Sequence, residues 1–141
     1  IREEDKFIIL IAIGINDSEC FESKENPCTN LHEFKKNLDR LIKIAKEHTE
    51  EVILIGLTPV DEEEINSYGQ SFMYNDLIKE YDKQIKETAK GTNLKFIDIF
   101  SKMSQESYQE LLVDGLHPNS KGYDFMYKII KDFLVKEKLI Q

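Results

Sequence analysis

The chain has 141 residues, of which 40% are hydrophobic and 10% aromatic, so it is long and apolar enough for one folded domain rather than a disordered segment. Its net charge of −8 opposes contact with phosphate backbones, so we expect no nucleic-acid partner. The longest apolar run covers residues 7–13, far short of the ~20 residues of a transmembrane helix, so we expect no membrane span.

Predicted strands and helices alternate along the chain. Three β-rich apolar runs predict strands, and three stripes of apolar residues spaced three and four apart predict helices. In chain order these are a strand over 7–13, a helix over 31–45, a strand over 52–57, a helix over 73–89, a strand over 94–99 and a helix over 123–134. This order is typical of β-α-β units around a parallel sheet, so we predict an α/β fold. No linker or repeat divides the chain, and residues 1–141 form a single predicted domain.

Particular residues mark the ends of the predicted helices. Asn30 can cap the first helix, with Glu33 in the reciprocal position of a capping box. Gly91 is expected to terminate the second helix, and Ser120 to cap the third. Residues 107–112 can add a short helical turn before it.

Cys20 and Cys28 lie in one polar stretch, with His32 nearby. Free thiols, a local disulfide and a metal cluster are three interpretations of this group. The spacing matches no common zinc motif, and the stretch offers no fourth ligand. We therefore expect free thiols and no metal site.

A turn before the last predicted helix contains Asp114 and His117, with Gly115 between them and Pro118 after them. In such a turn the carboxylate can reach imidazole Nδ1, which fixes the tautomer and leaves Nε2 as a general base. A surface turn whose Asp bonds only its own backbone has the same sequence. The motif alone leaves both interpretations open.

Gly14, Asn16 and Asp17 directly follow the first predicted strand. Ligands of open α/β sheets bind beyond the carboxyl ends of the strands, where these residues and the Asp-His turn are both expected. Glycine allows a tight exit from the strand, and an Asn carboxamide above the sheet can donate to an oxyanion. The alternative is an Asn-Asp turn that bonds only its own backbone.

Together, the Gly14-x-Asn16-Asp17 sequence after a strand and the Asp114-x-x-His117-Pro-Asn turn before the last helix resemble two sequence blocks of the SGNH (GDSL-type) hydrolases. The similarity extends in order along essentially the whole chain. It implies a three-layer α/β/α sandwich with a parallel, flavodoxin-like sheet. This chain would supply the last three of its five strands. The domain is thus expected to be N-terminally incomplete and to lack the first two.

The resemblance also implies a role for each matching residue. His117 resembles the family's general base, and Asp114 the carboxylate that orients it. Asn16 resembles the oxyanion-hole asparagine, while Gly14 and Asp17 resemble the residues that form and brace its turn. These roles imply a serine ester hydrolase that works through an acyl-enzyme, without a metal or an organic cofactor.

The family's nucleophile belongs to a Gly-Asp-Ser block, and no such sequence occurs in the 141 residues. Ser18, the serine nearest to Asn16, is expected to point along its own loop. We therefore expect the complete protein to hydrolyse small-molecule, carbohydrate or lipid esters, and this chain alone to be inactive. The alternative is a non-catalytic binding or interaction module on the same scaffold.

The strand over 7–13 would become a sheet edge if the first two strands are missing, and long apolar edges pair with other strands. We expect self-association through this strand, or a missing segment supplied by another chain. We also expect a cytoplasmic location, with secretion left open because the chain begins at Ile1 and not at a methionine.

Overall fold

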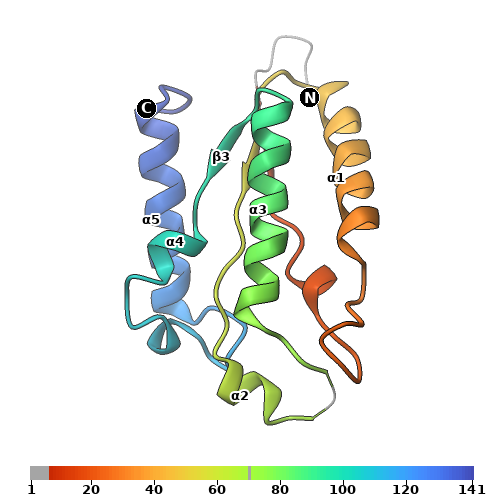
Figure 1. Cartoon of the computed structure of the whole chain (residues 1–141). Coiled ribbons are helices and arrows are strands. Elements are labelled where there is room, and N and C mark those ends of the chain that lie inside the picture. The colour runs from red at the N-terminus through yellow and green to blue at the C-terminus, as the bar shows by residue number, and fades with distance from the viewer. Residues whose placement is uncertain (1–6, 70) are drawn as a thin grey trace.

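A parallel sheet of three strands forms the centre of the computed structural model, which describes residues 7–69 and 71–141 (Figure 1). The strands are β1 (Ile9–Ile11), β2 (Val52–Ile55) and β3 (Lys95–Ile97), in the spatial order β1-β2-β3. Their register places Ile9 opposite Val52 and Ile55 opposite Ile97. All three predicted strands are confirmed, although each is shorter than the apolar run that predicted it.

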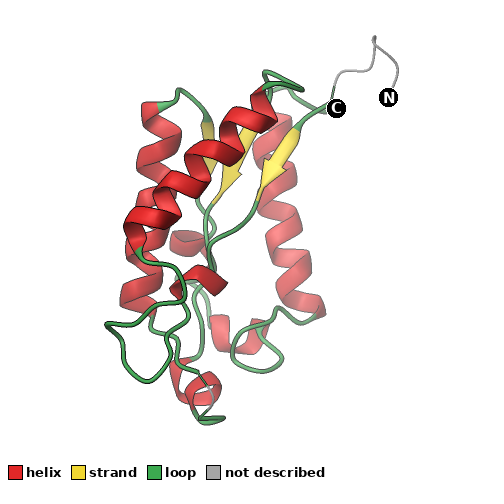
Figure 2. Ribbon diagram, turned by 90° about the vertical axis from the view of Figure 1, so that its right-hand side faces the viewer, coloured by secondary structure: helices red, strands yellow, loops and turns green. Residues whose placement is uncertain are grey.

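Helices cover both faces of this sheet, as Figures 1 and 2 show. α1 (Leu31–Lys46) and α3 (Asn75–Gly91) pack on one face, and α5 (Ser120–Lys136) packs on the other. The short α4 (Phe100–Met103) contributes Phe100 to the core on the first face and Met103 to the core on the second. The predicted three-layer α/β/α arrangement is therefore confirmed, with all described strand pairs parallel.

Alternate strand residues divide the core between the two faces, because successive side chains of a strand point to opposite sides. Ile11 and Leu54 belong to the cluster under α1 and α3, where the rings of Phe34 and Tyr81 lie 5.1 Å apart. Ile53 belongs to the second cluster, under α4 and α5. This is why β2, the central strand, is apolar at every position and buried throughout.

The remaining helical segments are short. They are the 3₁₀ turn η1 (Asn16–Ser18), the helix α2 (Glu62–Asn66) and the 3₁₀ turn η2 (Tyr108–Leu111). η2 confirms the short turn expected over 107–112. Figure 1 shows α2 and the loops that leave the strands at the lower end of the molecule, beyond the carboxyl ends of the strands.

The cap at Asn30 is confirmed, since its Oδ1 accepts a hydrogen bond from the Glu33 amide at 3.0 Å. The cap of α5 was wrongly predicted: Asn119, and not Ser120, accepts the bond from the Gly122 amide, at 3.1 Å. The end of α3 also differs. Gly91 is the last helical residue, and the left-handed conformation that follows the helix belongs to Asn93, with φ at 55°. Asparagine adopts this conformation more readily than most residues, so it can replace the expected glycine.

Both cysteines are free thiols, as predicted, with Cys20 buried and Cys28 exposed. The Cys20 backbone pairs with that of Phe72 through bonds of 2.8 and 2.9 Å, which joins the loop after η1 to the loop before α3. None of the described helices combines the length and the apolarity required to cross a membrane.

Candidate active site

The turn between η2 and α5 brings Asp114 and His117 together. Asp114 Oδ2 lies 2.7 Å from His117 Nδ1, and its Oδ1 accepts bonds from the backbone amides of His117 at 2.7 Å and Leu116 at 3.1 Å. The contact expected from the sequence motif is therefore present. With Nδ1 engaged by the carboxylate, Nε2 is the ring nitrogen that can accept a proton.

Hydrogen bonding to Asp114 keeps its carboxyl group ionised. The backbone amide of His117 is the largest cause of a lowered pKa at Asp114, followed by the His117 side chain. An ionised carboxylate beside imidazole stabilises the protonated ring that forms when a histidine acts as a base. The His117 side chain is 66% exposed, so it is accessible to a ligand at this end of the sheet.

Backbone packing around Gly115 holds this turn in place. Its φ is +79°, and a Cβ added there would lie 2.8 Å from the Ile65 amide nitrogen. The Gly115 carbonyl also accepts a bond from the Asp61 amide at 2.8 Å. Asp61 in turn caps α2 through bonds from the amides of Glu63 and Glu64. The turn that carries Asp114 and His117 is thus docked directly on the start of α2.

Asn16 is the first residue of the 3₁₀ turn that follows β1, and it is exposed. Gly14 makes the exit from the strand with φ at +122°, and a Cβ there would lie 3.0 Å from the Phe34 ring. The conformation and the close contact both favour glycine at this position. The expected role of Gly14 as the residue that forms the turn fits this geometry.

Ser18 is fully buried, and its hydroxyl donates to the Ile15 carbonyl at 2.7 Å. It therefore points into its own loop, as the sequence suggested. Asp17 braces the same turn, because its carbonyl accepts a bond from the Thr29 amide at 3.1 Å. Burial is the largest cause that raises the pKa of Tyr81 to about 12, and the negative charge of Asp17 adds to it.

Asn16 and the Asp114–His117 pair lie at the same end of the sheet. Within the described residues no hydrogen bond joins the Asn16 side chain to that pair, so the structure brings together the histidine and the aspartate but does not link them to the asparagine. An apolar pocket of about 150 Å³ lies at this end, between the exits of β1 and β2 and Met126 of α5.

Asp82 makes a partly buried contact near this end of the sheet that the sequence interpretation missed. Its Oδ1 accepts a hydrogen bond from the Leu57 amide at 2.7 Å, just after β2. Gly56 makes room for it, since a Cβ there would lie 2.6 Å from the same oxygen. The available signal was its place in α3, one residue after buried Tyr81 and four after buried Ile78, where an apolar side chain is expected.

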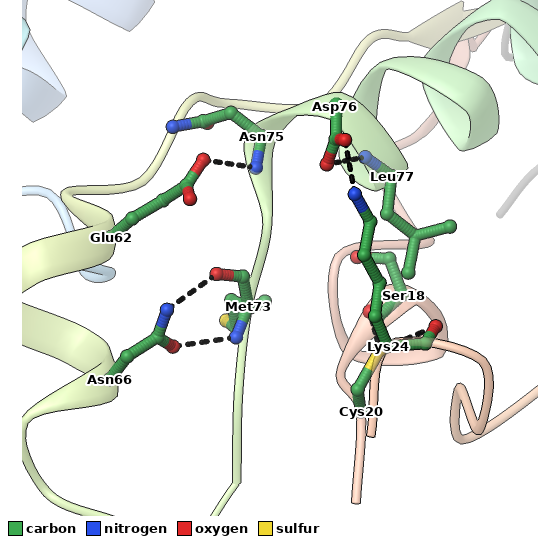
Figure 3. Close-up of polar contacts among 9 residues, drawn as sticks. All are labelled: Ser18, Cys20, Lys24, Glu62, Asn66, Met73, Asn75, Asp76 and Leu77. Atoms are coloured by element: carbon green, nitrogen blue, oxygen red, sulfur yellow. Dashed lines mark hydrogen bonds and ion pairs between the residues drawn. The ribbon is translucent and has the colours of Figure 1, made fainter.

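Polar contacts also join the loops around the site, as Figure 3 shows. Glu62 Oε1 accepts from the Asn75 amide at 2.7 Å, and Asn66 exchanges two bonds with the Met73 backbone. Lys24, in the loop after Asn16, forms an ion pair with Asp76 at the start of α3. The loops that carry Asn16 and support His117 are therefore both attached to the N-terminal end of α3.

The chain is similar to known hydrolases over most of its length. It is 26% identical to an isoamyl acetate-hydrolyzing esterase of Saccharomyces cerevisiae, over 94% of this chain and 60% of that protein. Its fold matches a lipase/acylhydrolase from Enterococcus faecalis with a TM-score of 0.72 and 25% identity, over 90% of this chain and 60% of the other. It also matches an acetylxylan esterase from Geobacillus stearothermophilus with a TM-score of 0.64 and 23% identity, over 89% and 56%.

The chain spans about 60% of the length of the relatives it matches. The model of the GDSL-like lipase/acylhydrolase family matches residues 3–125, which include both turns described above and the start of α5. The parallel α/β/α fold and the similar hydrolases agree with this match. The chain belongs to the GDSL-like lipase/acylhydrolase family.

Proposed function

We propose that the complete protein hydrolyses carboxylic esters by acyl transfer, with a serine nucleophile that is not among these 141 residues. The contact of 2.7 Å between Asp114 Oδ2 and His117 Nδ1 carries this proposal, because it prepares Nε2 to act as a base. The family supports ester hydrolysis as the reaction class.

In the proposed reaction, His117 Nε2 removes the proton of the serine hydroxyl while the serine oxygen attacks the ester carbonyl. The tetrahedral intermediate collapses when the protonated imidazole returns that proton to the leaving alcohol. Water then attacks the acyl-enzyme with the help of the same histidine, which releases the acid and regenerates the serine. Asp114 stays ionised throughout and stabilises the imidazolium.

Asn16 is the proposed side-chain donor to the oxyanion. Its exposed position in the 3₁₀ turn beyond β1 supports this role, and such a donor typically contributes about 10²–10³-fold to turnover. Gly14 and Asp17 would act only by shaping and bracing that turn. Because the yeast relative is named for an acetate ester, short acyl esters such as p-nitrophenyl acetate and isoamyl acetate are the first substrates to test.

The test uses the full-length protein with p-nitrophenyl acetate. We expect His117→Ala to abolish turnover and Asn16→Ala to reduce it by about 10²–10³-fold, with both variants folded by circular dichroism. His48→Ala is the matched control, because His48 lies exposed in the loop after α1, and it should leave turnover unchanged. Near-normal turnover by His117→Ala would refute the assignment.

The 141-residue chain alone is proposed to be inactive. We expect no covalent labelling of it by a fluorophosphonate probe, which reacts with serines activated by a neighbouring base. The buried hydroxyl of Ser18, bonded to the Ile15 carbonyl, supports this expectation for the serine nearest to Asn16. Stoichiometric labelling, located by mass spectrometry of peptides, would contradict it.

A further inference from the structure

Asn75, the first residue of α3, binds the loop that follows β2 with both polar groups of its side chain. Its Oδ1 accepts a hydrogen bond from the Val60 amide at 2.9 Å, and its Nδ2 donates to the Val60 carbonyl at 2.8 Å. A side chain that exchanges two such bonds with one residue pairs with it as a residue of a neighbouring antiparallel strand would. Asn75 therefore fixes the backbone of Val60 at its amide and at its carbonyl.

Both partners of this contact are also held by other contacts. The Val60 side chain is completely buried in the core under α1 and α3. The Asn75 amide lies in the first turn of α3, where it has no acceptor within the helix, and Glu62 Oε1 accepts its hydrogen at 2.7 Å (Figure 3). The contact between Asn75 and Val60 thus connects two anchored segments.

The peptide group between Val60 and Asp61 links this contact to the turn of His117. Its oxygen, the Val60 carbonyl, accepts from Asn75, and its N–H, the Asp61 amide, donates to the Gly115 carbonyl at 2.8 Å. Because a peptide group is planar, a bond that fixes the direction of its oxygen also fixes the direction of its N–H. A bond accepted by the oxygen also polarises the group and strengthens the N–H as a donor. Asn75 therefore acts on the bond that docks Gly115.

The bonds within the turn shape it but do not place it. The Asp114 carboxylate bonds to the His117 ring, and the Val113 amide donates to the His117 carbonyl at 2.8 Å. Among the described residues, the bond from Asp61 to Gly115 is the one backbone hydrogen bond between the loop after β2 and this turn. If that bond loses its alignment, Asp114 and His117 keep their mutual contact and are displaced together.

We infer that Asn75 is a positioning residue for His117. By orienting the peptide group between Val60 and Asp61, it holds the turn at the place from which Nε2 reaches the nucleophile. Its effect on turnover rests on the proposed function, whereas its effect on the docking of Gly115 does not.

The expected effect of losing this alignment falls on kcat. A displacement of about 1 Å at the reacting groups can lower turnover about 10²-fold. The displacement moves the base relative to the nucleophile and leaves the groups that bind the substrate in place. It therefore lowers kcat and leaves KM largely unchanged.

Asn66 provides a matched comparison in the same connection between β2 and α3. It also exchanges two bonds with one residue, at 3.0 and 2.8 Å, but that residue is Met73, just before α3 (Figure 3). Both asparagines are partly buried. Within the part of the chain that the structure describes, no hydrogen bond joins Met73 to the turn of His117. The two side chains thus make the same kind of contact, and only that of Asn75 continues to Gly115.

The experiment replaces each asparagine by aspartate in the full-length protein. Aspartate has the same shape and keeps an acceptor for the backbone amide, but when ionised it has no hydrogen for the backbone carbonyl. We expect Asn75→Asp to lower kcat for p-nitrophenyl acetate by about tenfold or more, with KM within about twofold of the parent value. Asn66→Asp adds the same charge and loses the same kind of bond, and it should keep kcat within about twofold.

Amide hydrogen exchange, followed by NMR, measures the docking independently of activity. Exchange at Asp61 should be about tenfold faster or more in Asn75→Asp and unchanged in Asn66→Asp, because the Asp61 hydrogen is the one donated to Gly115. Parental kcat in Asn75→Asp, equal losses of kcat in the two variants, or parental exchange at Asp61 in Asn75→Asp would overturn the inference. If the parent hydrolyses no ester, the proposed function fails, and exchange at Asp61 alone then decides the inference.

Discussion

Asp82 connects α3 to the exit of β2 by accepting a hydrogen bond from the Leu57 amide, but this position partly buries its negative charge, which is unfavourable. Burial is the largest cause of its raised pKa, and the bond from the Leu57 amide opposes that effect. Because the folded pKa is raised, ionisation of Asp82 favours unfolding. Its stabilising contribution is complete below the ordinary carboxyl pKa of about 3.9 and is lost as pH rises through the raised value.

Two substitutions separate the charge of Asp82 from its hydrogen bond. Asp82→Asn keeps an acceptor for the Leu57 amide and has no charge to bury, so we expect stability at neutral pH equal to or above that of the parent, with a flatter dependence on acidic pH. Asp82→Ala leaves the amide unpaired and should cost about 1–3 kcal/mol. Urea unfolding measured from about pH 4 to pH 8 checks both. Equal stability of the two variants would contradict the role of the hydrogen bond.

At the scale of the elements, Asn119 stabilises more than the start of α5. Its Oδ1 caps the helix, and its Nδ2 donates to the carbonyls of Glu110 at 2.8 Å and Leu112 at 3.1 Å. Within the part of the chain that the structure describes, the Asn30 side chain makes the cap bond to α1 alone. We expect Asn30→Ala to cost about 0.5–2 kcal/mol in the free energy of unfolding, and Asn119→Ala to cost more. Denaturant unfolding compares the two, and an equal loss would show that the extra bonds contribute nothing.

The sequence predicted the elements because their signals are local. Apolar runs and helical stripes gave three strands and three long helices, and the spacing of Asp114 and His117 predicted their contact, since three residues in one turn are sufficient for it. The cap at Asn119 was missed because Ser120 is an equally good cap by type, and only the path of the turn selects between them. The place of Asp82 among the apolar positions of α3 marks it as unusual, but its partner Leu57 lies 25 residues away in sequence, so no local pattern identifies the bond.

At the scale of the whole molecule, the contacts at the carboxyl end form a continuous support for the site. The His117 turn rests on α2 through Gly115 and Asp61, and α2 is bonded to the start of α3 through Glu62. The loop after Asn16 reaches the same helix through the Lys24–Asp76 ion pair. That pair is exposed and so contributes little stability by itself, which leaves the backbone bonds between Cys20 and Phe72 as the firmer attachment.

Exposed apolar side chains in and just after β1 bear on how this chain should behave in solution. Among the described residues β1 is an edge strand of the sheet, and apolar edge strands pair with other edges. Leu10 and Ile13 are each 40% exposed. We therefore expect reversible self-association through residues 7–13, weak because β1 offers only three strand residues for pairing. Sedimentation velocity over a range of concentrations should show a rising average mass. Leu10→Lys should return the chain to monomer, because it places a charge on the pairing face, whereas Ile44→Lys should leave association unchanged. A parent chain that stays monomeric at high concentration would contradict self-association.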